Sequence, residues 1–438
     1  MRKNEIHPQK IRTVSISGFN KKGYGEGETD TGGRLVVPYT IPGETARAEK
    51  RRKREGELVE VIEPSPSRIE PRCRHFGLCG GCLWQHMRYE DQLRFKQEKV
   101  QALAERFGVA LPREDLPIHP SPPFHYRNRM DFVWWYDGRF GLRQRGKWFA
   151  MEPLSECHLL PRAVMQTALA VNRRVREAGL PFHDQKHHKP GLRYLVVRRG
   201  VFSGEIMLNF VSDAMDLPSN LWEGLVNVVS VYQLVNNNQE SPVSDGDPKH
   251  LWGETCYREI ILGHEFKIGP KSFFQPNPAV AEAMVQHVRG LFENNSTQNR
   301  KLVDLYCGIG VFSILLNDLF ASILGIEAIP EAIEAAKEQS IGTNLEFKCM
   351  DAEKLDANAL IQYNTLLVDP PRSGMHPKVI KRILEIGFEE MVYVSCNPVR
   401  GMEDIAALSE AYQVASIKLF DQFPQTAHVE MIVHLKKS

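Results

Sequence analysis

The stretch KLVDLYCGIGVFS (301–313) decides the fold of the second half of the chain. It reads as a buried strand followed by a glycine-rich turn into a helix, and such glycines let the backbone approach a ligand. Three more apolar runs, SILGIEAI (322–329), NTLLVDPP (364–371) and EMVYVSCNP (390–398), alternate with helical segments. This alternation predicts a doubly wound α/β domain with a largely parallel sheet.

The upstream sequence has a different pattern and predicts further domains. Residues 1–63 contain short alternating runs broken by glycine and proline, which indicates a small β module. Residues 64–262 begin with a Pro/Ser linker and a cysteine-rich stretch, and the short strands after residue 125 indicate an antiparallel sheet. Residues 263–438 form the α/β domain, so the whole chain is expected to be a three-domain α/β protein.

The composition is that of a globular protein with an uneven charge distribution. No apolar run approaches the roughly 20 residues of a membrane span, and the N-terminus shows no secretion signal, so we expect a cytoplasmic protein with no membrane partner. The first 200 residues hold 37 Lys+Arg and 23 Asp+Glu, whereas the rest hold 18 and 31. The basic half indicates a partner such as nucleic acid, although solvated surface charge explains any single basic run equally well.

Acidic residues stand at the ends of successive strands of the predicted α/β domain. Glu327, Asp351 and Asp369 each follow an apolar run, and ligands of such sheets bind at the carboxyl ends of the strands. Acids without the lysine of a phosphate loop suit an adenosine that carries no phosphates, such as S-adenosylmethionine (SAM). The competing interpretation is that these residues are helix caps and turn formers.

Cys396 and Glu430 stand near the same predicted edge. Cys396 follows a strand and precedes a rigid Asn-Pro turn, and Glu430 begins the last apolar run. Taken alone, each would be an ordinary buried thiol or strand-end acid. Beside SAM, the pair fits methylation of uracil C5: a thiolate adds at C6, C5 takes the methyl group, and a separate base removes the C5 proton.

The motifs FFQPN (273–277), DLYCGIG, DPPRSG, SCNP and HVE occur in this order and resemble the RNA 5-methyluridine methyltransferase family. The resemblance implies a Rossmann-like SAM domain, Cys396 as nucleophile and Glu430 as the base. It implies that Phe273 lies near a flipped base and that any contact of Val311 is made through its backbone. The implied SAM contacts are Gln275, Tyr306, Glu327, Asp351 and Asp369.

Residues 1–63 resemble a TRAM domain through GYGEG and VPYTIPGE, which implies an oligonucleotide-binding type of β-barrel and an RNA partner. Farther along, CRHFGLCGGC supplies three cysteines within ten residues, and a fourth follows in LSECHLLP. Four thiolates suit zinc or an iron–sulfur cluster equally well. The family resemblance favours a [4Fe–4S] cluster, closed by four ligands and therefore structural or RNA-contacting. The predicted ligands are Cys73, Cys79, Cys82 and Cys157.

These features favour a uracil-5 methyltransferase acting on 23S rRNA, because the tRNA enzymes of this family generally lack the cluster in bacteria. A tRNA T-loop enzyme is the alternative. An RNA cytosine enzyme is disfavoured because DPPRSG contains no second cysteine. A non-catalytic RNA-binding iron–sulfur protein would leave the strand-end acids without a purpose. No obligate protein partner is evident.

Overall fold

The computed structural model describes residues 8–112, 116–238, 244–293, 300–340 and 344–438. The chain forms two compact units, each assembled from separate segments. The first contains the chain up to Phe95 together with Gly141–His158 and Phe423–Ala427, and the second contains Lys96–Phe140, Leu159–Gln422 and His428–Ser438. The division into three domains that are each continuous along the chain, with boundaries at residues 63 and 262, remains a prediction.

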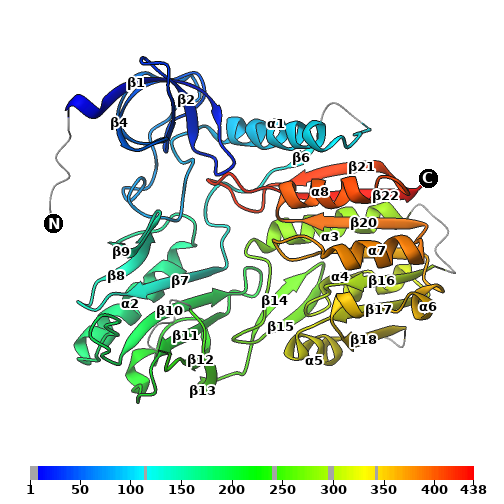
Figure 1. Ribbon diagram of the computed structural model, residues 1–438. Helices are drawn as coiled ribbons and strands as arrows, with labels where there is room; N and C mark the ends of the chain where they lie inside the picture. Colours follow the sequence, from blue (N-terminus) through cyan, green and yellow to red (C-terminus); the bar gives the residue numbers. More distant parts are fainter. Residues whose placement is uncertain (1–7, 113–115, 239–243, 294–299, 341–343) are drawn as a thin grey trace. The chain divides into compact units, whose positions relative to one another are not determined.

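The first unit contains a closed five-stranded barrel in the order β1-β2-β3-β5-β4 (Figure 1). Its interior is formed by small and branched side chains that alternate with exposed residues, as a half-buried strand requires. At Gly27 a Cβ would lie 1.9 Å from the carbonyl oxygen of Ser15, so only glycine allows β1 and β2 to approach this closely. The strands are β1 (Ile11–Phe19), β2 (Gly25–Thr29), β3 (Arg34–Val37), β4 (Thr45–Arg52) and β5 (Glu55–Glu63).

The rest of the first unit packs around Trp84, which is 2% exposed. Its indole Nε1 donates a hydrogen bond to the carbonyl of Gly23 (2.9 Å), and its ring joins a cluster with Leu83, Met87 and Ala427. The hairpin of β8 (Phe140–Gln144) and β9 (Lys147–Pro153) lies almost entirely in this unit. Helix α1 (Tyr89–Phe107) then leads into the second unit.

The second unit begins with a sheet that contains the strand order β13-β12-β11-β10-β7. The sequence predicts an antiparallel sheet here, and this is wrong for one pair, because β11 and β12 are parallel. The chain leaves β11, crosses over through a short 3-10 helix at Ser219–Leu221, and returns in the same direction. The strands are β7 (Arg129–Trp134), β10 (Leu192–Arg199), β11 (Ile206–Ser212), β12 (Val228–Val235) and β13 (Asp247–Gly253), with α2 (Arg162–Glu177) and the separate hairpin β14 (Tyr257–Ile261)–β15 (His264–Ile268).

The C-terminal sheet has the order β18-β17-β16-β19-β20-β22-β21-β6. The first five strands in this order pair in parallel and β22 pairs antiparallel with β20, which confirms the predicted doubly wound, largely parallel sheet. The strands are β6 (Ile118–His119), β16 (Lys301–Leu305), β17 (Ser322–Glu327), β18 (Leu345–Cys349), β19 (Thr365–Val368), β20 (Glu390–Ser395), β21 (Tyr412–Phe420) and β22 (Glu430–Lys437). The helices are α3 (Pro278–Glu293), α4 (Val311–Leu315), α5 (Pro330–Gln339), α6 (Ala357–Leu360), α7 (Pro377–Ile386) and α8 (Pro398–Leu408).

Both faces of this sheet are covered by helices, because successive side chains of a strand point to opposite faces. Leu302 of β16 belongs to the apolar cluster that contains Val288 of α3. The next residue, Val303, belongs to the cluster that contains Ile383 of α7 and Ile405 of α8. Burial on both faces explains why the parallel strands read as continuous apolar runs. Among the helices that the structure describes, none is long and apolar enough to cross a bilayer.

Candidate active site

The turn after β16 brings backbone groups to the carboxyl edge of the sheet. Tyr306 has a left-handed φ of 65°, which is rare for a residue with a side chain. Gly310 has a φ of 81°, and a Cβ there would lie 2.9 Å from the ring of Phe347. The conformation of this turn therefore depends on glycine and on the strained Tyr306, and strain of this kind is common at ligand sites.

Glu327 ends β17 beside this turn. Its Oε2 accepts a hydrogen bond from the backbone N–H of Gly308 (3.2 Å), and its Oε1 accepts from those of Ala328 and Ile329 (2.7 and 3.0 Å). Burial raises the pKa of Tyr306 to about 12, and the charges of Asp351 and Glu327 add to this effect. Three of the predicted SAM residues are therefore neighbours at one edge.

Asp351 has a structural role as well. It lies beyond the end of β18, is exposed, and its Oδ1 caps the short helix Ala352–Lys354 by accepting from the N–H of Glu353 (2.9 Å). Val311, the first residue of α4, follows Gly310 directly. Both positions border the glycine turn, and the competing interpretation of Asp351 as a helix cap also describes its observed contact.

Two more carboxyl groups lie at the same edge. Asp304 is 1% exposed, and its Oδ2 accepts from both the N–H (3.1 Å) and the hydroxyl (2.6 Å) of Ser313. Burial raises the pKa of Asp304 to about 6. Burial likewise raises the pKa of Asp369, the residue after β19, to about 7, and the charge of Asp304 adds to it. The carboxyl groups at this edge thus extend to Asp369, the first residue of the loop DPPRSG.

Cys396 and Glu430 are brought together by the antiparallel pairing of β20 with β22. Ser395 pairs with Met431, so Cys396 and Glu430 come next to each other at the end of the two strands. Burial raises the pKa of Glu430, which is 4% exposed, to about 8. Burial raises the pKa of the Cys396 thiol to about 12, with Glu430 and Asp369 as the next contributors. The three groups therefore form one electrostatically coupled cluster.

Arg372 is a cation beside this cluster, and its role was not predicted from the sequence. Its charge opposes the increases in the pKa values of Cys396 and Glu430. Its backbone carbonyl accepts a hydrogen bond from the side-chain amide of Asn397 (2.9 Å), and its Nη2 lies 3.2 Å from Nδ1 of His428. The arginine within DPPRSG was the available signal, because a cation beside a thiol favours the thiolate.

Asp404 of α8 is a second residue that sequence reasoning missed. It is buried, and its Oδ2 accepts from the hydroxyl of Tyr393 (2.6 Å) and from the N–H of Met375 (2.8 Å). A Cβ at Gly374 would lie 3.0 Å from the same oxygen. Asp404 therefore ties the loop after β19 to β20 and α8, the two elements that flank Cys396. The sequence around it resembles that of any amphipathic helix and carries no signal for this role.

Gln275 and Phe273 belong to the segment before α3. The Oε1 of Gln275 accepts from Nε2 of Gln422 (2.9 Å), and its backbone carbonyl accepts from Nδ2 of Asn128 (2.9 Å). Phe273 is 70% exposed, an unusual position for a large apolar ring. Asn277 is 1% exposed and donates to the hydroxyl of Ser121 (2.8 Å). The motif FFQPN is thus fixed on the C-terminal side of an exposed aromatic ring.

The four upstream cysteines lie within electrostatic reach of one another. Burial raises the pKa of Cys79 to about 11 and of Cys82 to about 12, and the other cysteines contribute to both. The Sγ of Cys82 accepts from Nε2 of Gln85 (3.1 Å), and that of Cys79 accepts from the N–H of Gly81 (3.3 Å). Cys73 and Cys157 complete the set, and no disulfide is formed by any of the chain's eight cysteines, all of which lie in the described ranges.

The donor chemistry of these cysteines fits a soft metal, and N–H groups that donate to the ligand atoms typically orient the ligands of such sites. Their arrangement does not fit one, because the described residues contain no group of three or more Cys, His, Asp or Glu placed to hold a metal ion. The predicted [4Fe–4S] cluster is therefore not supported by this geometry, and no catalytic step depends on it.

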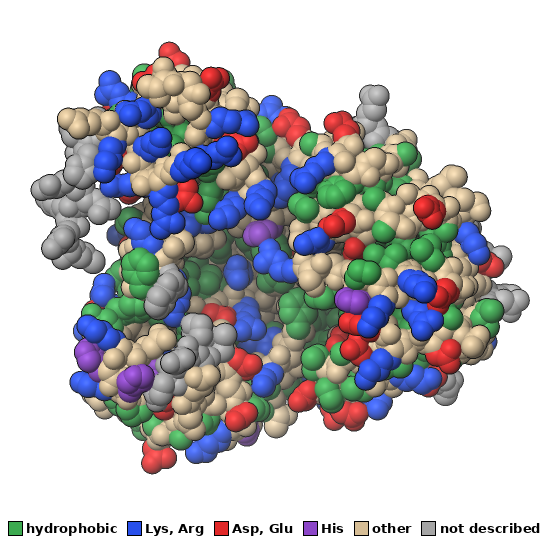
Figure 2. Space-filling view, in the orientation of Figure 1, with side chains coloured by type: hydrophobic (Ala, Val, Ile, Leu, Met, Phe, Trp, Pro, Cys, Tyr) green, Lys and Arg blue, Asp and Glu red, His purple; other side chains and the backbone are tan. Residues whose placement is uncertain are grey.

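Basic side chains gather over the barrel, as Figure 2 shows on the face in view. Several are paired with glutamates, for example Arg47 with Glu60 (2.7 Å) and Arg51 with Glu57 (2.8 Å). The cluster remains a dense group of cations with the character of a nucleic-acid-binding face. Its exposed members are Lys21, Lys22, Arg34, Arg47, Lys50, Arg51, Arg52, Lys53 and Arg54.

A doubly wound sheet with acids, a glycine turn and a thiol at its carboxyl edge defines a Rossmann-like SAM-dependent methyltransferase. Comparison with known proteins identifies the family of this methyltransferase. The family model of tRNA (uracil-5-)-methyltransferases matches residues 263–438. An uncharacterized RNA methyltransferase of Nanoarchaeum equitans is 34% identical over 97% of this chain and 93% of its own length.

A tRNA (uracil(54)-C(5))-methyltransferase of Pyrococcus abyssi is 33% identical over 92% of this chain and 95% of its own length. The crystal structure of the P. abyssi tRNA (uracil-54, C5)-methyltransferase in complex with S-adenosyl-L-homocysteine superimposes with a TM-score of 0.81. The sequence identity is 29%, and the match covers 97% of this chain and 100% of that one. The chain belongs to the RNA 5-methyluridine methyltransferase family, and it is a SAM-dependent RNA (uracil-5-)-methyltransferase.

Proposed function

We propose that the enzyme methylates C5 of the T-loop uridine of tRNA, with Cys396 as nucleophile and Glu430 as general base. The observation that carries the roles is the pairing of β20 with β22, which sets these two side chains beside each other at the edge that holds the acids. The tRNA target is supported by relatives named tRNA (uracil(54)-C(5))-methyltransferase in three Pyrococcus species, which are 32–33% identical over 92% of this chain.

The chemistry requires both residues. Uracil C5 is a poor nucleophile until the Cys396 thiolate forms an Sγ–C6 bond, which makes C5 enolate-like. The electron pair at C5 then forms a new carbon–carbon bond to the electrophilic methyl group that SAM would supply, and the methyl–sulfur bond breaks to leave S-adenosylhomocysteine. Glu430 then accepts the C5 proton, the Sγ–C6 bond breaks, and Cys396 returns as a thiolate. A target base within folded RNA must first be flipped out of its stack.

The strand-end residues bind and orient the cofactor in this proposal. Glu327 would accept hydrogen bonds from the ribose hydroxyls, and the strained backbone around Tyr306 would contact the cofactor. Asp369, Asp351 and Gln275 complete the contacts. The exposed ring of Phe273 is available to stack on the flipped base, since an aromatic face accepts any base.

The protonation states of Cys396 and Glu430 should control the methylation rate. Glu430, with a pKa of about 8 in the absence of RNA, must be a carboxylate to act as a base, and the Cys396 thiol must also lose its proton. The single-turnover methylation rate is therefore expected to rise with pH up to about 8 or above. A rate that stays constant between about pH 6 and pH 9 would contradict the assignment.

RNA that contains 5-fluorouridine tests the two roles directly, because no C5 proton is available for removal. The wild type should form a SAM-dependent covalent adduct, and Cys396→Ala should not. Cys256→Ala, at a half-buried cysteine outside the site, is the control and should react like the wild type. With ordinary RNA, Glu430→Gln should accumulate a methylated adduct; normal turnover by this variant excludes Glu430 as the base.

The second candidate target is a uridine of 23S rRNA, which the four upstream cysteines favour under the family resemblance. The two targets are distinguished by mass-spectrometric mapping of 5-methyluridine in tRNA and 23S rRNA from cells with and without the gene. Loss of 5-methyluridine from the tRNA T-loop supports the main proposal, and loss from 23S rRNA alone replaces it with the second.

The upstream parts of the chain are proposed to serve RNA binding. The barrel would act as a TRAM domain that follows the RNA backbone with its basic face, in a cytoplasmic enzyme. Cys73, Cys79, Cys82 and Cys157 would hold a [4Fe–4S] cluster with a structural or RNA-contacting role. Anaerobically purified enzyme should then be brown and contain iron, whereas a colourless enzyme with one zinc overturns the iron–sulfur assignment.

A further inference from the structure

A cavity of about 190 Å³ lies in the second unit, on the face of the sheet that contains β10, β11 and β12. None of the residues predicted to bind SAM or to react with uracil lines it. Its walls include apolar side chains, and its opening includes two cations. The residues that line the cavity include Arg129, Val196, Asn209, Leu234, Pro270 and Lys271.

Asn209 gives the cavity its chemical preference. The side chain is fully buried in β11, and its Nδ2 donates to the carbonyl oxygen of Pro270 (3.2 Å). Because a carbonyl only accepts hydrogen bonds, the amide nitrogen must face Pro270, and this orientation fixes Oδ1 as the other end. Oδ1 is buried and has no hydrogen-bond partner among the described residues. A ligand that supplies an N–H or O–H donor would satisfy it.

The walls and the opening restrict the ligand further. Val196 and Leu234 form part of its wall and are themselves packed in the apolar core of the sheet. Arg129 uses Nε and Nη2 to pair with Asp131 (2.9 and 3.0 Å), and its side chain is 38% exposed. Lys271 is 48% exposed at the opening, and its Nζ lies 3.6 Å from Asp245. A cavity with a hydrogen-bond acceptor inside and exposed cations at its mouth matches a nucleobase attached to a phosphodiester.

Two sets of hydrogen bonds fix the segments beside the cavity. On one side, the buried guanidinium of Arg198 donates to the carbonyls of Gly269 (2.7 Å), Pro270 (3.0 Å) and Ser272 (2.6 Å). These bonds fix the segment whose continuation carries Phe273 and Gln275. Gln275 follows Lys271 by four positions, which span at most about 14 Å of chain, so the cavity opens close to the proposed target site.

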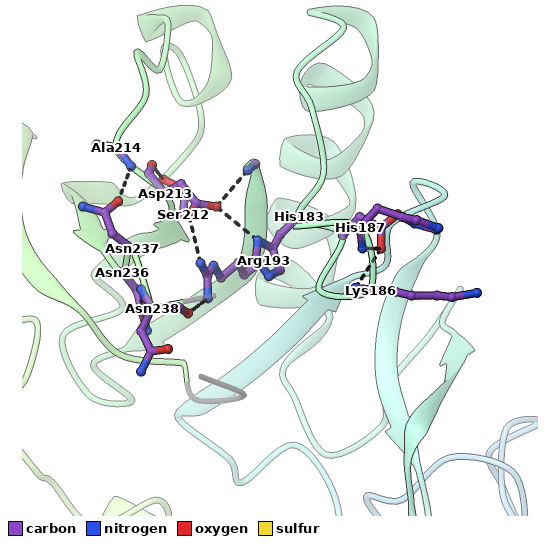
Figure 3. A network of polar contacts seen from close by, with 12 residues as sticks. His183, Lys186, His187, Arg193, Ser212, Asp213, Ala214, Asn236, Asn237 and Asn238 are labelled. Atoms are coloured by element: carbon purple, nitrogen blue, oxygen red, sulfur yellow. Dashed lines mark hydrogen bonds and ion pairs between the residues drawn. The ribbon is translucent and has the colours of Figure 1, made fainter. Parts of the chain in front are cut away.

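On the other side, a polar network braces the segment after β12. Figure 3 shows Arg193 directed from β10 towards Asp213 and Asn238. Its Nη2 donates to Asp213 (2.9 Å) and its Nη1 to the carbonyl of Asn238 (2.7 Å). In the same segment Asn236 donates from Nδ2 to the carbonyl of Asp245 (2.8 Å), a residue of the cavity rim.

We infer that this cavity binds a second, unmodified nucleotide of the RNA substrate, close in the strand to the uridine that is methylated. Asn209 accepts a hydrogen bond from the base through Oδ1, and Lys271 and Arg129 contact its phosphate. The inference rests on the RNA-methylating function but not on which RNA or which uridine is the target.

Asn209→Leu removes the acceptor in the cavity, and it should weaken RNA binding about tenfold. The KM for SAM should stay unchanged. The control is Thr167→Val in α2, a buried hydroxyl that bonds within its own helix and does not line the cavity. Binding is measured without SAM, so it reports on the cavity even if the proposed target or the proposed catalytic roles fail.

A scan of abasic RNAs identifies the nucleotide. Each RNA lacks one base on either side of the target uridine. One position should cost the wild type roughly tenfold in affinity and cost Asn209→Leu almost nothing, because the base and Asn209 act as a pair. Equal penalties for wild type and variant at every position overturn the inference, as does an Asn209→Leu enzyme that binds intact RNA normally.

Lys271→Gln provides the test if Asn209→Leu does not fold. It should lower the dependence of log K on log salt by about one unit. Lys337→Gln, at a comparably exposed lysine paired with Glu334 (3.0 Å), is its control and should leave the slope unchanged. Equal slopes for the wild type and Lys271→Gln exclude a phosphate at the cavity mouth and overturn the inference.

Discussion

Replacing Glu430 with glutamine is expected to make the folded protein more stable than the wild type at neutral and alkaline pH. Glu430 is 4% exposed, and burial raises its pKa from the ordinary 4.5 to about 8. Between these two values the folded state retains a proton that the unfolded state has lost. The free energy of unfolding of the wild type therefore falls as pH rises through this window, and it does not fall further for this reason above about pH 8.

Glutamine has nearly the same shape and never ionises, so the variant lacks this loss. A shift from 4.5 to about 8 corresponds to a maximum of about 5 kcal/mol, at about 1.4 kcal/mol for each pH unit. Relaxation of the unfolded chain and of the site reduces this, and we expect a gain of about 2–4 kcal/mol at pH 8.5 relative to pH 4.5. The gain should appear gradually across the window.

Urea unfolding of both proteins at intervals from pH 4.5 to pH 9 measures the difference. Glu389→Gln is the matched control, since it makes the same chemical change at an exposed side chain and should leave the pH dependence unaltered. If the stability difference between wild type and Glu430→Gln is independent of pH, Glu430 ionises like a surface carboxylate, and the argument for a buried base fails.

Three further predictions concern the neighbouring groups. Gly310→Ala should lower the free energy of unfolding by about 1–2 kcal/mol or more, because φ is 81° and the new Cβ would meet Phe347. The control is Gly290→Ala, at a helix position with open space around it, which should be neutral or stabilising in the same urea assay. Asp404→Asn should reduce kcat several-fold with little change in the KM for SAM, and Tyr393→Phe should do the same. The double variant should lose less activity than the sum of the two single effects on the activation free energy, and steady-state kinetics of all three variants will check this. Iodoacetamide at pH 8 should label the exposed Cys349 well before Cys396. Glu430→Gln should speed the labelling of Cys396, because the variant lacks a negative charge that raises the pKa of this thiol. Peptide mass spectrometry measures the labelling, and a result in which Cys396 is labelled first would contradict the coupling.

The C-terminal fold could be predicted because its signals are local. Each parallel strand is buried on both faces and therefore appears as an apolar run, and each functional residue follows its strand directly. The central sheet was harder: strand propensity does not encode the direction of pairing, so the parallel contact of β11 with β12 was missed. The composition of the first unit, which takes in Phe423–Ala427 from near the end of the chain, likewise has no local signature.

The sequence alone determined the class of chemistry, because a thiol, a carboxylate and strand-end acids are defined by residue type and by their order along strands. The tertiary structure decided how these groups behave. Burial, which depends on packing from distant segments, raises the pKa of Glu430 to about 8 and couples it to Cys396. Packing also gave Asp404 its bracing role and left the Oδ1 of Asn209 without a partner among the described residues. Such properties belong to an environment assembled from several strands and loops, and no single stretch of sequence contains them.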